Sequence, residues 1–98
     1  MVPIRLIADG VNEQSVRYEF TEGKAYSVGE AEKIKKFLGY VFFGNESVYK
    51  GSIEFEFTED GDTYVIKRDF EKTVVTLKKN ARETLSGGEA EAFIADIV

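Results

Sequence analysis

Acidic residues are the commonest side chains able to do chemistry in this sequence, with 18 Asp and Glu in a chain of 98 residues. Glu54 and Glu56 invite a search for paired catalytic carboxylates, and residues 60–62 offer oxygen ligands that suit calcium. Both glutamates alternate with phenylalanines, which favours a solvated strand face. The longer EF-hand pattern with its distant Glu is missing, so a hairpin turn is the better interpretation of residues 60–62.

The sequence contains no Cys and no His, and it also lacks Trp. These absences exclude disulfides, thiolate nucleophiles, Cys/His zinc sites, Ser-His-Asp triads and histidine acid-base catalysis. We therefore expect no catalytic residue and no metal site in this chain. No cofactor is expected either, and ATP with magnesium would bind only if a phosphate-binding loop were supplied elsewhere.

Residues 27–36 join a short extended run to a lysine-rich helix, the context in which P-loops hold phosphates on helix N-terminal amides. The candidate phosphate-binding residues are Gly29, Glu30, Lys33 and Lys35. A P-loop requires a second glycine where this chain has Ile34, and a magnesium-binding hydroxyl where it has Lys36. We therefore do not expect nucleotide binding of the usual kind.

The segment 64–82 has the opposite charge from the rest of the chain. It holds six basic residues against two acidic ones, a balance of +4 in a protein of net charge −5. Such asymmetry is typical of a nucleic-acid contact surface, although it is also typical of a solvated sheet face. The candidate contact residues are Lys67, Lys72, Lys78 and Lys79.

Alternating apolar and polar residues predict the strands that must position these groups. We expect strands over 4–8, 15–20, 53–58 and 64–69, a β-branched strand over 73–77, and a short run over 24–28. In the strand over 64–69, Tyr64, Ile66 and Arg68 alternate with Val65, Lys67 and Asp69. An Asp60-Gly61 turn closes the best-patterned hairpin.

Apolar spacings of three and four predict an amphipathic helix over 29–43, opened by a capping box between Ser27 and Glu30. A second capping box, Ser86 with Glu89, opens a helix that reaches Val98 with no cap behind it, as the end of a fragment would. We predict an α+β fold, mainly an antiparallel sheet of about six strands in β-β-β-α-β-β-β-α order, packed against two helices. The expected organisation is a single domain over 1–98, or a lobe of a larger protein.

Residues 4–7, 16–29, 34–44, 51–57 and 64–70 together resemble the N-terminal lobe of ABC-type ATPases of the SMC and double-strand-break-repair superfamily. In that family a strand pair leads into the P-loop, and a helix and an antiparallel meander follow. Here the P-loop is shortened or lost. The resemblance implies a lobe or degenerate homologue that does not hydrolyse ATP by itself, whose partner is the second lobe or another subunit.

Residues 85–89, Leu-Ser-Gly-Gly-Glu, spell the signature motif of the same family. The resemblance implies that Ser86, Gly87 and Gly88 contact the γ-phosphate of a nucleotide held by the opposite subunit. The alternative interpretation is a helix N-cap with glycines in front.

Two hypotheses therefore stand: the degenerate ATPase lobe, with weak DNA contact, and a small α+β protein-interaction module with no nucleotide chemistry. A wide loop of inward-pointing amides at Gly29 would favour the first, and a tight cap the second. No run approaches the roughly 20 apolar residues that span a bilayer, and no leader pattern opens the chain, so a soluble cytoplasmic protein without membrane contact is expected.

Overall fold

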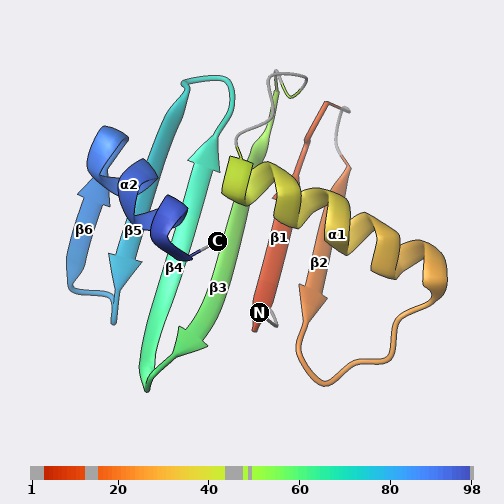
Figure 1. Cartoon of the computed structure of the whole chain (residues 1–98). Helices are drawn as coiled ribbons and strands as arrows, with labels where there is room; N and C mark the ends of the chain where they lie inside the picture. Colours follow the sequence, from red (N-terminus) through yellow and green to blue (C-terminus); the bar gives the residue numbers. More distant parts are fainter. Residues whose placement is uncertain (1–3, 13–15, 44–47, 49, 98) are drawn as a thin grey trace.

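The computed structural model describes residues 4–12, 16–43, 48 and 50–97, without the side chains of residues 83 and 84. Within these residues, six strands form one sheet in which every neighbouring pair is antiparallel, and both helices lie on the same face of it (Figure 1). The sheet order is β2-β1-β3-β4-β5-β6. The strands are β1 (Arg5–Asp9), β2 (Arg17–Thr21), β3 (Ser52–Glu59), β4 (Asp62–Asp69), β5 (Val74–Lys79) and β6 (Glu83–Ser86). The helices are α1 (Val28–Phe43) and α2 (Gly87–Ile97).

The predicted α+β class, the six antiparallel strands and the two helices are confirmed, but the order is β-β-α-β-β-β-β-α. The predicted strand over 24–28 is wrong. Residues 24–27 have no regular structure and Val28 already belongs to α1. The Tyr26 hydroxyl accepts from the Thr21 N–H at 2.8 Å and donates to the Thr21 carbonyl at 3.2 Å. These two bonds hold the connection against the end of β2.

The sixth strand is β6, which the sequence patterns did not predict. A tight turn precedes it, in which the Arg82 N–H donates to the Lys79 carbonyl at 3.0 Å. Asn80 and Ala81 have positive φ values of 50° and 59°, and the register pair Lys79 and Glu83 gives this hairpin a three-residue loop. The predicted turn at Asp60 and Gly61 also has two positive φ values, 52° and 82°, and it is a two-residue loop of the kind that Asp-Gly predicts.

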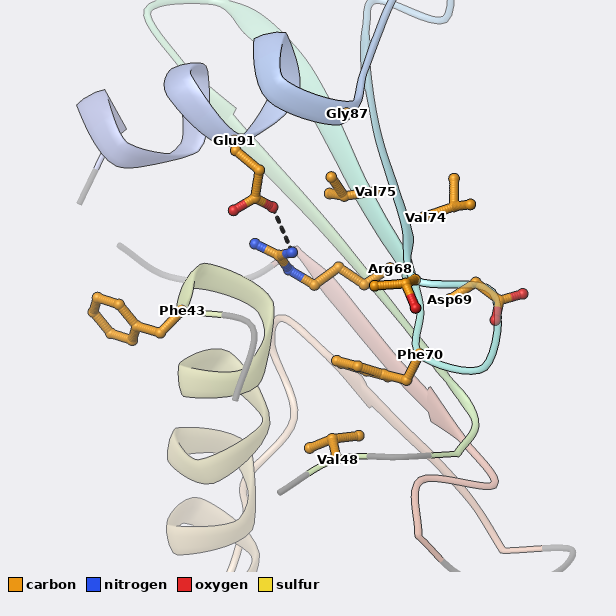
Figure 2. Close-up of a pocket in the computed structure, with 10 residues that line it drawn as sticks. Phe43, Val48, Arg68, Asp69, Phe70, Val74, Val75, Gly87 and Glu91 are labelled. Carbon is orange, nitrogen blue, oxygen red and sulfur yellow. Dashed lines mark ion pairs between the residues drawn. The ribbon is translucent and has the colours of Figure 1, made fainter. Parts of the chain in front are cut away.

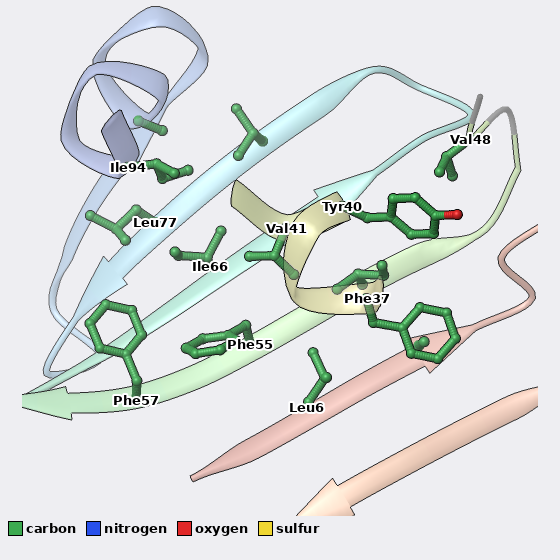
Figure 3. Close-up of a cluster of buried hydrophobic side chains, with 14 of the residues drawn as sticks. Leu6, Phe37, Tyr40, Val41, Val48, Phe55, Phe57, Ile66, Leu77 and Ile94 are labelled. Atoms are coloured by element: carbon green, nitrogen blue, oxygen red, sulfur yellow. The ribbon is translucent and has the colours of Figure 1, made fainter. Parts of the chain in front are cut away.

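The alternation in β3 decides which face of the sheet is covered. Ile53, Phe55 and Phe57 are buried beneath the helices, whereas Glu54 and Glu56 lie on the open face as predicted. Phe37 and Val41 of α1 and Ile94 of α2 complete the core from above (Figure 3). The buried core comprises Leu6, Ala8, Phe20, Phe37, Tyr40, Val41, Val48, Ile53, Phe55, Phe57, Ile66, Val75, Leu77, Ala90 and Ile94.

Gly51 is the residue that lets β3 pair with β1. Its φ is +91°, and a Cβ there would lie 2.5 Å from the carbonyl carbon and oxygen of Gly10. No side chain fits into that approach, so glycine is required for a steric as well as a conformational reason. The β1–β2 hairpin is thereby joined to the β3–β6 meander.

The N-terminus of α1 is closed by the predicted capping box. The Ser27 Oγ accepts from the Glu30 N–H at 3.2 Å, and the Glu30 carboxylate accepts from the Ser27 N–H at 3.1 Å. The second predicted box is absent, since no hydrogen bond joins Ser86 and Glu89 in the described part of the chain. Ser86 is still the last residue of β6, and Gly87, with a φ of 58°, turns the chain into α2.

Candidate functional site

A pocket of about 440 Å³ opens between the end of α1, the start of α2 and the turn from β4 to β5 (Figure 2). We call it the Arg68 pocket. Its lining residues are Phe43, Val48, Arg68, Asp69, Phe70, Thr73, Val74, Val75, Gly87 and Glu91. Two apolar side chains at its rim are open to solvent: Phe43 is 71% exposed and Val74 is 46% exposed.

Arg68 is the one buried charged residue in the described part of the chain, with 8% of its surface exposed. Its position in β4 points toward the helices, because Ile53 and Val75, its register partners in β3 and β5, are both core residues. Burying a guanidinium is expensive unless its donors are paired. The pairing of its three nitrogens therefore decides what this residue does.

Two of the three nitrogens are paired. The Nε–H donates to the Val41 carbonyl at 2.5 Å, and Nη1 forms an ion pair with the Glu91 carboxylate at 2.5 Å (Figure 2). The last turn of α1 has no basic residue of its own, so Arg68 supplies the positive charge that the carbonyl end of a helix favours. Arg68 thus joins β4 to both helices. Nη2 is buried and has no acceptor among the described residues.

The turn that forms one wall of the pocket is held by Asp69. Its carboxylate accepts from the N–H groups of Glu71 and Lys72 at 3.1 and 3.0 Å. Thr73, which follows, has a φ of 57°, and this left-handed conformation is unfavourable for a β-branched residue. Phe70 and Val74, on either side of this hydrogen-bonded turn, both line the pocket.

The charges around the pocket nearly cancel. Arg68 contributes one positive charge, whereas Asp69 and Glu91 contribute two negative charges. The first turn of α2 adds roughly half a positive charge through the helix dipole. Among the residues that the structure describes, no group of three His, Cys, Asp or Glu residues is able to hold a metal ion.

The predicted phosphate-binding residues lie elsewhere, at the start of α1. The Glu30 amide is occupied by Ser27, and these hydrogen bonds to Ser27 hold the pKa of the Glu30 carboxyl below its ordinary value. Lys33 turns to the Tyr18 hydroxyl at 2.8 Å and lies 4.2 Å from the centre of that ring, whereas Lys35 is exposed to solvent. Gly29 thus belongs to a tight cap, the geometry that favours the interaction-module hypothesis.

Ser86, Gly87 and Gly88 mark the passage from β6 to α2, at the opposite edge of the sheet from the start of α1 (Figure 1). Five strand spacings separate β2 from β6, about 24 Å. The two glycine-containing segments therefore do not form one site within this chain. Gly87 instead lines the Arg68 pocket.

The four candidate DNA-contact lysines are distributed over two faces and both ends of the strands. Lys67 and Lys78 share the open face of the sheet, since their register partners Thr76 and Val65 lie on that face. Lys79 lies on the helix side and pairs with Asp62 at 3.7 Å. Lys72 is in the β4–β5 turn, at the far end of β5 from Lys79. These lysines do not form one continuous patch.

Sequence reasoning missed Arg68 as a site residue, although a signal was present. Arg68 follows Tyr64 and Ile66 at the apolar register positions of its strand, where a charged side chain is rare unless it is paired. A guanidinium at such a position predicts a buried ion pair or a ligand.

None of the helices in the described part of the chain is long and apolar enough to cross a membrane. No protein-family model matches the chain, and no curated protein matches it either. The function must therefore be argued from the site itself.

Proposed function

We propose that this chain is a small α+β protein-interaction module without nucleotide chemistry, which docks an apolar segment of a partner protein in the Arg68 pocket. The observation that carries the proposal is the buried Arg68 Nη2, which has no acceptor among the described residues, beside a pocket with an apolar exposed rim. A polar donor among apolar walls is the usual composition of a binding pocket, in which the apolar area supplies affinity and the donor fixes orientation.

The volume limits what can bind. A pocket of about 440 Å³ lies at the lower end of the range for small-ligand sites, about 300–1,000 Å³, so it would hold one or two side chains of a partner. Phe43 and Val74 are the exposed apolar residues that line the pocket, so they would contact such a segment at its rim. Large exposed apolar side chains beside a concavity are typical of interaction sites.

The tight cap at Gly29 also supports this proposal over the ATPase-lobe hypothesis, because the Ser27 and Glu30 amides are bonded within the capping box and do not open toward a phosphate. We expect Mg-ATP to leave the melting temperature unchanged. A ligand at a hundredfold excess over its Kd would stabilise the folded state by about 2.7 kcal/mol. A saturable increase of several degrees would favour the ATPase lobe instead. The cytoplasmic location and the weak DNA contact stay predictions.

A peptide-display selection against the folded chain tests the proposal directly. Peptides that bind should carry clustered apolar residues and should lose binding to the Val74→Lys variant. Val28→Lys is the matched control, since Val28 is 80% exposed and lies at the start of α1, away from the pocket. Both positions are exposed enough for the substitution to change stability little. Selection of no peptide, or of peptides that bind Val74→Lys unchanged, would refute the proposed docking site.

A further inference from the structure

The remaining donor of Arg68 restricts the chemistry of the group that it can bind. This inference rests on the proposed function, since it concerns the same pocket. We infer that the docked segment presents a neutral carbonyl oxygen, such as a main-chain amide carbonyl, to Nη2 of Arg68. A carboxylate or a phosphate is the less favourable partner.

The first argument is geometric. Arginine selects carboxylates and phosphates by donating two parallel N–H bonds from its planar fork. One nitrogen of each possible fork already has a partner, because Nη1 is paired with Glu91 and Nε with the Val41 carbonyl. Nη2 is the nitrogen left without an acceptor among the described residues, so a ligand meets one nitrogen and a single acceptor oxygen suffices.

The second argument is electrostatic. Asp69 and Glu91 outweigh the charge of Arg68 by one unit among the side chains lining the pocket, and the α2 dipole offsets about half of that. A ligand carrying a negative charge would enter a site whose own balance is negative. A carbonyl avoids this repulsion and still satisfies the donor.

Nη2 is buried, so side chains must move before a ligand reaches it. Phe43 lines the pocket and is 71% exposed, so it can change rotamer within nanoseconds without breaking the ion pair between Arg68 and Glu91.

Two small molecules with the same apolar body separate the alternatives: isovaleramide and isovalerate. Each is titrated into the ¹⁵N-labelled full chain while the backbone amides of Val75 and Gly87 and the side-chain N–H groups of Arg68 are observed. Isovaleramide should move these signals and bind about two- to fivefold more tightly than isovalerate. The upper figure corresponds to the repulsion of one unit charge at about 4 Å in water.

Tighter binding of isovalerate would overturn the neutral-carbonyl inference and leave the apolar docking site intact. If neither probe moved the Arg68 signals while the display selection succeeded, the role of Nη2 would be refuted but the proposed function would stand. If both experiments failed, both proposals would fall. Arg68→Lys, checked for folding by its own spectrum, keeps the charge balance of the pocket but removes Nη2, and it should weaken the binding of isovaleramide.

Discussion

The two hairpin turns whose central residues have positive φ provide a test of backbone strain within one molecule. The turn at Asp60 and Gly61 has glycine at its second central position, whereas the turn at Asn80 and Ala81 has alanine there, with a φ of 59°. A left-handed conformation costs a residue with a Cβ roughly 1–2 kcal/mol. Ala81→Gly removes that cost but adds about 0.4–1 kcal/mol of unfolded-state entropy, so we expect a net stabilisation of about 0.5–1 kcal/mol.

The measurement is urea denaturation followed by circular dichroism, supported by thermal melts. A gain of this size corresponds to an increase in melting temperature of about 3–6 °C for a domain of this length, with an unchanged dependence on urea. The reciprocal change, Gly61→Ala, should destabilise the fold through strain alone. Gly61 has a φ of +82°, and an added Cβ there would meet nothing within 4 Å.

Ala92→Gly is the control, since it makes the same chemical change at an exposed position inside α2. Glycine costs about 1 kcal/mol in a helix interior, so this variant should be less stable. A destabilised Ala81→Gly, or a neutral Gly61→Ala, would show that φ does not control these turns.

Three further predictions concern the core, the β3 approach and the α1 cap. Phe57→Ala, at a side chain with 0% exposure, should cost about 3–5 kcal/mol in chemical denaturation, whereas Phe43→Ala should cost less than about 0.5 kcal/mol. Gly51→Ala should prevent folding or destabilise the fold by several kcal/mol, roughly the sum of backbone strain and overpacking against Gly10. Gly39→Ala in α1, where an added Cβ meets nothing within 4 Å, should instead stabilise the fold by about 0.5–1 kcal/mol. Equal effects of the two substitutions would contradict the close approach of Gly51 to Gly10. The Glu30 carboxyl has a lowered pKa, so the stability it contributes should be present above the ordinary value of 4.5 and be lost as the pH falls through the folded-state pKa. Unfolding measured from pH 7 to pH 3 should show the difference between wild type and Glu30→Gln shrinking over that range, and a constant difference would contradict the capping role.

Local patterns were sufficient for most of the sheet. Alternation in Ile53, Phe55 and Phe57 predicted both the strand and its buried face, because a strand period of two leaves little ambiguity when one face is covered. The sixth strand was missed because it has only four residues and follows Ala81, a residue that carries no turn signal.

The candidate site was less predictable for a different reason. It needs the end of α1, the β4–β5 turn and the start of α2, which lie far apart along the chain. No local pattern encodes the meeting of Val41, Arg68 and Glu91. The glycine and lysine residues at the start of α1 resemble a phosphate-binding sequence, but a capping box between Ser27 and Glu30 accounts for the structure there.

The anchoring of α2 links binding to local stability. Ala90 and Ile94 of this helix are buried, Phe93 and Ile97 pack partly buried against the core, and Glu91 holds the ion pair with Arg68. A short helix that packs over the β5 and β6 edge of the sheet opens more readily than the central strands do, in the hierarchy that amide hydrogen exchange reveals. A segment seated between the two helices would contact α2 only while α2 is docked on β5. Occupancy of the pocket would therefore slow exchange along the whole helix, so the helix would report on the ligand even at residues that never touch it.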